Sequence, residues 1–313
     1  MDDEQMKAFV EEQLHPSLEV LEEERKKLAH AAKRNIGLGL IPGIFFATII
    51  AYYTGAVRIA GLVLIFFPTL AFTFPRRDIF IKKFQTEVVT RIFQAYHFDL
   101  QFQDEKMPRD EIYASGLFQK HGRTIFGNVL SGKSQGIAFD LCRFTYTGNQ
   151  NGWINFMSNS NTSYTGLFLR AKLPYSREAG VWVFPDRFPV PKATYEKEKV
   201  VLESLDFDTL FQIRGDQIQA REIFTPLAME RLMQASAFVN DYTPGSSQSG
   251  EICMSFVEEY VYLFIPHAGL VFEPSIFESL LLEKNIEKYE KQAKMIFHVL
   301  ALLDLSRGTL RNV

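Results

Sequence analysis

The chain has 313 residues, of which 47% are hydrophobic and 23% charged, and its formal net charge is −3. A chain of this length forms one or two domains. Nucleic-acid-binding proteins normally carry a basic patch or a high pI, so the weakly negative charge argues against nucleic acid as a partner. The two cysteines, Cys142 and Cys253, lie in no CxxC motif or Cys/His cluster, and we expect buried free thiols in a reducing compartment.

Residues 1–34 predict a cytoplasmic amphipathic helix. Its apolar stripe follows a 4-3-7 spacing, with Arg25 at the expected seam position, and consists of Leu14, Leu18, Leu21 and Leu28. A short stripe on a charged helix favours packing against the protein's own folded domain. Self-association as a short coiled coil is the alternative.

Residues 35–75 predict a two-helix transmembrane hairpin, with spans at about 36–53 and 59–74 and Arg58 as its single charge. A helix rises about 1.5 Å per residue, so roughly 17 to 25 residues cross a hydrocarbon core. The positive-inside rule places both termini in the cytoplasm. The basic residues that flank the hairpin are Arg25, Lys26, Lys27, Lys33, Arg34, Arg76, Arg77, Lys82 and Lys83. We therefore predict a multi-pass protein of the bacterial inner (plasma) membrane, with the lipid bilayer as a partner.

Residues 76–313 predict a cytoplasmic α+β domain. Residues 77–98 continue a helical pattern whose apolar face is Ile79, Phe80, Phe84, Val88, Ile92 and Phe93. Residues 98–224 then switch to short aromatic and β-branched segments, which are TIFGNVL, GIAFDLCRFTYTG, GWINFM, YTGLFLRAKL, VWVFP, KVVLESL and LFQIRG. NQNG (149–152) reads as a hairpin turn and SNSNTS (158–163) as a polar loop. No long helix alternates with these segments, so an antiparallel sheet is favoured over a doubly wound parallel one.

The last third predicts a helix, a hairpin and a second, long helix. Thr225 and Pro226 fit the N-cap and first turn of a helix. ICMSFVEEYVYLFIPH predicts two strands that turn near Glu258 and Glu259. The long C-terminal helix is expected to begin near Pro274, and its apolar face to comprise Ile276, Leu280, Leu281, Ile286, Ile296, Leu300 and Leu303.

Two stretches resemble an uncharacterised bacterial membrane family with two spans and a domain of unknown function, often encoded near LemA-type proteins. Residues 201–232, VLESLDFDTLFQIRGDQIQAREIFTPLAMERL, are similar to that family's strand, Phe-rich link, Asp, Ala-Arg pair and Thr-Pro helix start. Residues 270–280, LVFEPSIFESL, are similar to its Phe-Glu-Pro helix start. Departures lie in residues 100–200. The resemblance implies architecture and location and carries no activity.

One motif spells a nucleotide-binding loop. GNVLSGKS, with Gly127, Gly132, Lys133 and Ser134, matches GxxxxGK[ST], in which backbone amides cradle phosphate and Lys reaches its oxygens. Such a loop needs a helix that begins at the Lys-Ser pair. The residues that follow, QGIAFDLCRFTY, alternate with period two and indicate a strand. A glycine-containing turn between two strands is the better interpretation, and we expect no cofactor.

No metal or catalytic motif is present. The six histidines are dispersed, no HExxH or GxSxG occurs, and we expect neither metal ligands nor catalytic residues. Asp216, Arg221 and Glu273 are charged residues of the family-like stretches and could form a polar cluster. An ion pair or cap network is favoured over a ligand site, because Asp bonds its own backbone at turns and Glu suits a helix amino terminus.

These patterns favour a membrane-anchored cytoplasmic binding or scaffold module that acts with other membrane proteins or self-associates, and not an enzyme. The alternative is an enzyme or nucleotide-binding protein with an unrecognised site. The first predicts exposed apolar or mixed patches. The second predicts a cleft with perturbed titratable groups near residues 127–134 or near Asp216 and Arg221.

Overall fold

The computed structural model describes residues 8–54, 74–95, 99–103, 107–119, 123–134, 136–148, 162–173, 176–186, 188, 190–242, 252–266, 272 and 274–301. The chain divides into two compact units. Unit 1 comprises Met1–Tyr96 and Phe272–Tyr289, and unit 2 comprises His97–Val271 and Glu290–Val313. The predicted domain boundaries after residues 34 and 75 remain a prediction.

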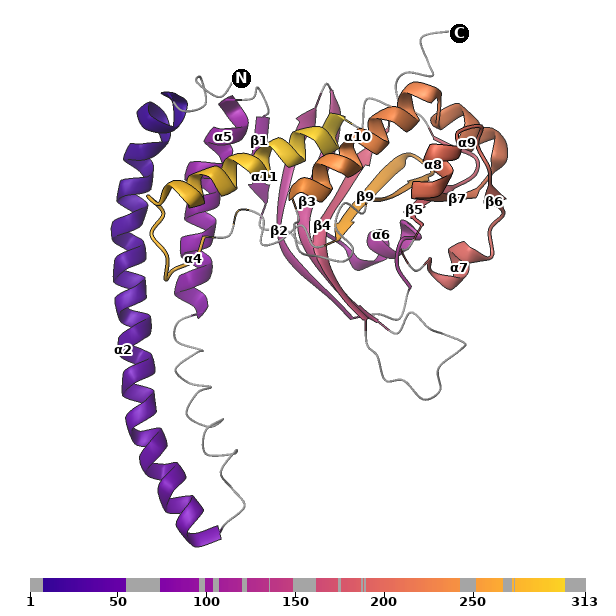
Figure 1. Cartoon of the computed structure of the whole chain (residues 1–313). Coiled ribbons are helices and arrows are strands. Elements are labelled where there is room, and N and C mark those ends of the chain that lie inside the picture. The colour runs from indigo at the N-terminus through magenta and orange to yellow at the C-terminus, as the bar shows by residue number, and fades with distance from the viewer. Residues whose placement is uncertain are drawn as a thin grey trace. The chain divides into compact units, whose positions relative to one another are not determined.

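Unit 1 is helical. In chain order its elements are η1 (Val10–Leu14), α2 (His15–Thr54), α4 (Phe74–Phe84), η2 (Gln85–Val89) and α5 (Thr90–Ala95), where η denotes a π-helical turn. Figure 1 shows α2 beside the continuous α4–η2–α5 rod, and the two are in contact. Leu14, Leu18 and Leu21 are buried, so the predicted stripe packs within the chain's own fold.

The α4–η2–α5 rod also follows the predicted apolar pattern, with one exception. Its buried face contains Phe80, Phe84, Val88, Ile92 and Phe93. Ile79, which was predicted on the same face, is exposed. Polar contacts join the rod to α2, because Lys83 pairs with Glu24 and the Arg91 guanidinium donates 2.7 Å to Ser17 Oγ.

The predicted transmembrane hairpin is corrected by the structure. Within the described residues, no helix combines the length and the apolar character that a membrane span requires. This finding contradicts the two-pass anchor and, with it, the predicted multi-pass inner-membrane location with both termini in the cytoplasm. The helix that contains residues 36–53 begins at His15, and the charged segment 15–34 is its first half. The side chains of residues 36–54 and all of residues 55–73 lie outside the described part.

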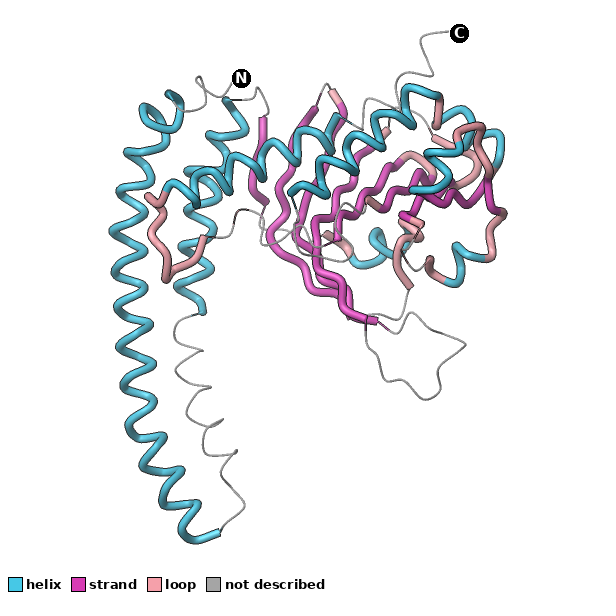
Figure 2. The backbone as a smooth tube through the Cα atoms, in the orientation of Figure 1, coloured by secondary structure: helices cyan, strands magenta, loops and turns pink. Residues whose placement is uncertain are grey.

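In its described residues, unit 2 is built on a nine-stranded sheet in the order β1-β2-β3-β4-β9-β8-β5-β7-β6 (Figure 2). The strands are β1 (Asp99–Gln103), β2 (Arg123–Ser134), β3 (Ile137–Gly148), β4 (Thr162–Lys172), β5 (Val181–Pro185), β6 (Lys199–Val200), β7 (Phe211–Gly215), β8 (Cys253–Val257) and β9 (Tyr260–Pro266). Every pairing is antiparallel, as the sequence predicted. The predicted strand GWINFM and most of its flanking turns, 149–161, lie outside the described residues.

The helices of unit 2 are α6 (Arg109–Ala114), α7 (Lys192–Tyr195), α8 (Leu205–Leu210), α9 (Gln217–Ile223) and α10 (Pro226–Tyr242). Thr225 caps α10 as predicted, since its Oγ1 accepts the Ala228 N–H at 3.3 Å. KVVLESL is a strand only at Lys199 and Val200. The Ser204 hydroxyl accepts the Phe207 N–H and caps α8, so the chain turns helical there.

The C-terminal helix, α11 (Glu283–Ala301), begins nine residues later than predicted. Residues 283–289 of this helix belong to unit 1 and residues 290–301 to unit 2. Residues 274–282 contain no α-helix, yet Ile276 and Leu280 within them are buried. The helix-like spacing of these two apolar residues therefore reflects their burial and not a helix.

The two faces of the sheet have different cores. One face carries an aromatic cluster in which Phe118, just after α6, contacts the rings of Phe144, Tyr146, Phe168 and Phe264 at centroid distances of 4.7–6.2 Å. On the other face, Phe207 of α8 contacts Phe211 at 4.9 Å, and Phe224 before α10 contacts Phe256 at 6.1 Å. Helices α8, α9 and α10 thus cover the second face, which leaves their outer sides for solvent.

Candidate functional site

The residues that spell a nucleotide-binding loop form a strand. Gly127, Gly132, Lys133 and Ser134 all lie in β2, and residues 129–133 pair with β1 on one side and with β3 on the other. The chain reverses only after Ser134, in a two-residue turn whose Gly136 has a φ of +83°. A phosphate cradle needs converging amides of a loop and a helix amino terminus. This strand provides neither, and Lys133 is exposed.

The predicted polar cluster is not assembled as a ligand site. Asp216 caps α9, because its Oδ1 accepts the Gln219 N–H at 2.8 Å. Arg221 lies exposed in the last turn of the same helix. Glu273 lies outside the described residues. The cap is the structural role that the sequence favoured for Asp216.

A row of polar and aromatic side chains crosses the aromatic face of the sheet. The cross-strand register places in one line Ser131, Asp140, Arg170, Tyr262, Ser255, Trp182, Arg214 and Lys199. Directly opposed residues of antiparallel strands project from the same face of the sheet. Each of these eight side chains therefore lies beside the next one on the adjacent strand. We call them the polar row.

Arg170 is the centre of the polar row. Its guanidinium pairs with Asp140 of β3 and with Glu111 of α6, and it lies 5.5 Å from the ring centroid of Tyr260. Asp140 in turn accepts the Ser131 hydroxyl at 2.5 Å. Two carboxylates therefore neutralise the arginine and fill its hydrogen-bonding directions. This network fixes α6 on the sheet and leaves Arg170 little capacity to bind an anion.

The other side chains of the polar row are covered by neighbouring side chains or hydrogen-bonded to the backbone. Burial raises the pKa of Tyr262 to about 12, despite the positive charge of Arg170. The Trp182 indole donates 2.9 Å to Ser115 O, and the Arg214 guanidinium stacks 4.5 Å from the ring centroid of Tyr195. The fully buried Ser255 hydroxyl has no hydrogen-bond partner among the described residues, and it lies between Tyr262 and Trp182 along the row. We see here a structural network and not a cleft.

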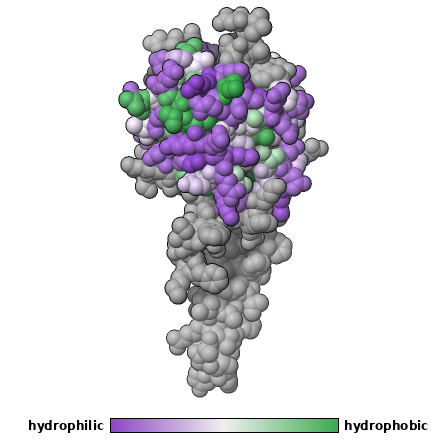
Figure 3. Space-filling view, turned by 90° about the vertical axis from the view of Figure 1, so that its right-hand side faces the viewer, coloured by the Kyte–Doolittle hydropathy of each residue, from purple (hydrophilic) through white to green (hydrophobic). Residues whose placement is uncertain are grey.

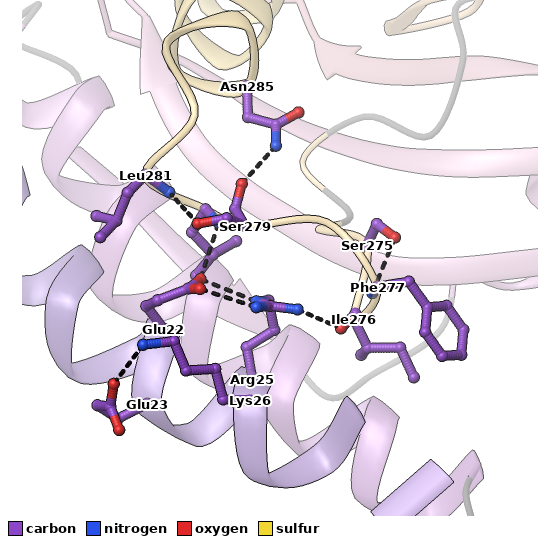
Figure 4. Close-up of polar contacts among 11 residues, drawn as sticks. Glu22, Glu23, Arg25, Lys26, Ser275, Ile276, Phe277, Ser279, Leu281 and Asn285 are labelled. Carbon is purple, nitrogen blue, oxygen red and sulfur yellow. Dashed lines mark hydrogen bonds and ion pairs between the residues drawn. The ribbon is translucent and has the colours of Figure 1, made fainter. Parts of the chain in front are cut away.

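Unit 1 contains a second buried network (Figure 4). Glu22 and Arg25 pair at 2.8 Å on α2, and Arg25 Nη1 donates 2.7 Å to Ile276 O. The Leu280 N–H donates 2.9 Å to Glu22 Oε2. Burial raises the pKa of Glu22, but the hydrogen bonds from Arg25, Leu280 and Ser279 outweigh it, so the pKa lies below its usual value. The pair thus satisfies the backbone of the non-helical segment 274–282.

An open groove of about 550 Å³ runs beside the same helix. Its lining residues are Glu23, Lys26, Lys27, His30, Ala31 and Arg34, all from α2. Glu23 and Lys26 already pair at 2.7 Å. Polar groups from a single helix do not converge on a common point, so the described lining lacks the geometry of a catalytic site. The described residues also hold no group of three metal-ligating side chains.

The most distinctive surface of unit 2 is apolar. Four side chains on the outer sides of β6–α8, α9 and α10 are 84%, 70%, 59% and 55% exposed, and they are Leu205, Ile218, Val201 and Leu227, in that order. We call them the apolar patch. Figure 3 views the side of unit 2 that carries α8, α9 and β6, and it shows apolar surface gathered within a polar surround.

Contacts beneath the patch hold its elements together. The Gln217 side-chain amide lies 3.3 Å from Val201 O, which places α9 beside the end of β6. Phe207 and Phe224 contact each other at 5.8 Å, which ties α8 to the start of α10. Their neighbours Leu205 and Leu227 project outward. The patch therefore stands on a packed base.

Sequence reasoning missed this patch. Val201 and Leu205 belonged to the predicted strand KVVLESL. A signal was present, because Glu203, Asp206 and Asp208 interrupt the apolar residues at every second or third position. A fully buried strand would not carry three acids within six residues.

Comparison with known proteins finds a family match over part of the chain and a distant similarity to a solved structure. A family described as a protein of unknown function, DUF3137, matches residues 162–305, a range that contains the whole apolar patch. No curated protein matches the chain. The crystal structure of the mycobacterial trehalose monomycolate transport factor A, TtfA, is similar with a TM-score of 0.35 and 10% identity over 69% of this chain and 92% of that chain.

Proposed function

We propose that this chain, which carries a DUF3137 domain at residues 162–305, is a non-catalytic binding module, and that the apolar patch is its protein-binding surface. The observation that carries the proposal is the exposure of Leu205, Ile218, Val201 and Leu227, together with the apolar surface gathered on this side of unit 2 (Figure 3). Contiguous exposed apolar groups rimmed by polar residues mark interaction sites.

The energetics of the patch support this role. Burying one such side chain contributes about 1.5–3 kcal/mol, so two or three together supply a useful share of a binding free energy. Exposed leucines and isoleucines contribute nothing comparable to folding. The base that Phe207 and Phe224 form makes the patch a preorganised surface, and preorganisation lowers the entropic cost of association.

The polar groups of the chain support a binding role over a catalytic one. Arg170 pairs with both Asp140 and Glu111, and Glu22 pairs with Arg25 in unit 1. Burial is the main cause of the raised pKa values of Cys142 and Tyr262. Catalytic groups are typically perturbed and accessible together.

Co-purification tests the proposal. The tagged full chain and a Leu205→Ser/Ile218→Ser variant are recovered from native cells, and the co-purifying proteins are quantified. Each lost anchor is worth at least about 1.4 kcal/mol, a factor of ten in affinity, so recovery of a true partner falls at least tenfold. The matched control is Val20→Ser/Ile79→Ser, which replaces two exposed apolar residues of unit 1.

The possible results distinguish a binding role of the apolar patch from its absence. Both double variants keep the fold, because exposed substitutions change the unfolding free energy by about 0.5 kcal/mol or less. Equal recovery by the two variants would show that the patch is not the interface. A full chain that is monomeric and recovers no protein overturns the binding role.

The resemblance to a family encoded near LemA-type proteins belongs with this proposal. It supplies a first set of proteins to seek among those that co-purify. Self-association is the other form of the same role, and the mass of the purified full chain by light scattering detects it.

A further inference from the structure

Basic residues are concentrated in two segments of unit 1, one in α2 and one in α4. Residues 25–34 contain five basic residues and no acidic one, and residues 76–83 contain four basic residues and one acidic one, Asp78. Three of these nine bases form ion pairs with glutamates of α2. The pairs are Arg25–Glu22, Lys26–Glu23 and Lys83–Glu24. With each pair counted as neutral, the two segments keep a net charge of +5, whereas the whole chain carries −3.

The two segments lie at the same level along the pair of helices. Lys83 of α4 pairs with Glu24 of α2, and a hydrogen bond joins α5 to an earlier turn of α2, so the helices run antiparallel and in contact (Figure 1). Arg76 is seven residues before Lys83, and Ala31 is seven residues after Glu24. Because both α-helices rise about 1.5 Å per residue, Arg76 lies at the level of Ala31, in the middle of the basic segment of α2.

Four of these bases are exposed and form no ion pair with any residue that the structure describes. They are Lys27, Lys33, Arg34 and Arg76, and we call them the basic collar. The buried side of α2 at this level carries Ala29 and Ala32, so the three collar residues of α2 lie on its solvent side. The open groove of about 550 Å³ passes Lys27 and Arg34. The collar is therefore accessible to a dissolved or surface-bound anion.

The chemistry of the collar suits phosphate. A guanidinium group, as in Arg34 and Arg76, donates two parallel hydrogen bonds to phosphate oxygens, and a lysine ammonium group acts as a point charge. Lys27 and Arg34 are two helical turns apart, about 10 Å along the axis, so the four cations do not converge on one point. A single phosphate ion would meet one or two of them. A ligand with several closely spaced phosphates would meet all four.

From this arrangement we propose that the basic collar binds closely spaced phosphate groups, which an anionic lipid surface or a soluble polyphosphate presents. The proposal concerns unit 1 and is independent of the apolar patch on unit 2. Each Lys or Arg beside anionic headgroups strengthens the attraction about fivefold, so four cations act together strongly. Asp78 and Glu23 are the acids beside the collar, and Lys26 already neutralises Glu23. A single opposing carboxylate does not cancel four cations.

Binding of the full chain to two phosphate probes tests the proposal. One probe is a phosphatidylcholine vesicle that contains a minority of anionic phosphatidylglycerol, with a vesicle of phosphatidylcholine alone as its control, and flotation measures the bound protein. The other probe is inorganic polyphosphate in solution, and titration calorimetry measures its affinity. We expect anionic vesicles, polyphosphate or both to bind, and anionic vesicles to bind at least tenfold more tightly than neutral ones. Binding weakens several-fold between about 50 mM and about 500 mM salt, because exposed charges are screened.

Variants of the protein locate the binding. Lys27→Ala/Arg34→Ala is expected to weaken binding at least tenfold, and circular dichroism should show an unchanged fold because both sites are exposed. The matched control is Lys197→Ala/Arg231→Ala, which removes one exposed lysine and one exposed arginine of unit 2 and leaves the affinity unchanged. Lys27→Arg/Arg34→Lys keeps both charges and should keep most of the binding, which separates a charge effect from a structural one.

The results also identify the source of the phosphate. Binding to anionic vesicles but not to polyphosphate identifies a lipid surface, and the reverse identifies a soluble ligand. Binding to neither anionic vesicles nor polyphosphate overturns the proposal, and so does an equal loss in the two alanine variants. Equal binding to neutral and anionic vesicles, without binding to polyphosphate, overturns it as well. The co-purification test of the apolar patch uses other variants, so either proposal can fail while the other stands.

Discussion

Glu22 and Arg25 lie one turn apart on α2 and form an ion pair whose side chains are only 5% and 10% exposed. The next pair along the helix, Glu23 and Lys26, has the same spacing and is 64% and 57% exposed. The two pairs therefore provide a matched comparison of a buried and an exposed ion pair within one helix.

Arg25→Ala is expected to destabilise the protein far more than Lys26→Ala. Loss of Arg25 leaves the buried Glu22 uncompensated and Ile276 O without its donor, which costs about 3 kcal/mol. Loss of Lys26 breaks an exposed pair that contributes little. Urea unfolding followed by circular dichroism measures both. Equal midpoints for the two variants would contradict the importance of the buried pair.

Glu22 also predicts a pH dependence. Its pKa in the folded protein lies below the ordinary value of 4.5, so its contribution to stability is present above that value and is lost as the pH falls through the lower, folded pKa. The unfolding free energy of the wild type should exceed that of Glu22→Gln at neutral pH, and the difference should shrink under acid. A difference that is constant between neutral and acid pH would rule out this linkage.

We expect the stability of the fold to be sensitive to substitution of Gly116. Its φ is +69°, and a Cβ at this position would lie 2.3 Å from Trp182 Nε1, which donates to Ser115 O. Gly116→Ala is expected to cost about 2 kcal/mol or more, because both the backbone and the indole must shift. The comparison is Gly127→Ala, whose Cβ would lie 3.1 Å from Arg143 Cβ with no positive φ. A smaller loss for Gly116→Ala than for Gly127→Ala would refute the packing role.

The two cysteines should be unreactive in the native state. Neither forms a disulfide bond, both are buried, and burial raises the pKa of Cys142 to about 12. The thiolate is the reactive form, so a thiol reagent at about pH 8 should modify neither residue until the protein unfolds. Time-resolved labelling with and without denaturant measures this. Rapid native labelling of either residue would contradict its burial.

Much of the fold followed from local patterns. Short aromatic and β-branched segments predicted β2, β3, β4, β5, β7 and the β8–β9 hairpin, and period-two alternation supported β3. The predicted turn at Glu258 and Glu259 is present, and Glu258 has a φ of +52°. The Thr225 cap and the buried leucines of α2 were also predicted. These features depend on neighbours in sequence.

The errors arose where one pattern fits two structures. Ile276 and Leu280 have helical spacing, but they are buried in a segment whose backbone bonds to Glu22 and Arg25, some 250 residues away. The apolar run at residues 36–53 read as a membrane span, whereas the described residues contain no helix suited to cross a membrane. Composition alone measures how apolar a segment is and not which surface covers it.

The sequence by itself determined the antiparallel sheet, its longer strands and the start of α10 at Thr225. Only the tertiary structure decided that Val201, Leu205, Ile218 and Leu227 face outward together. The reason is physical. Leu, Ile and Val have the same chemistry in a core and on a surface, and Phe207 and Phe224 take the core positions on the second face of the sheet. Once those rings are buried, the neighbouring aliphatic side chains remain exposed and form the patch.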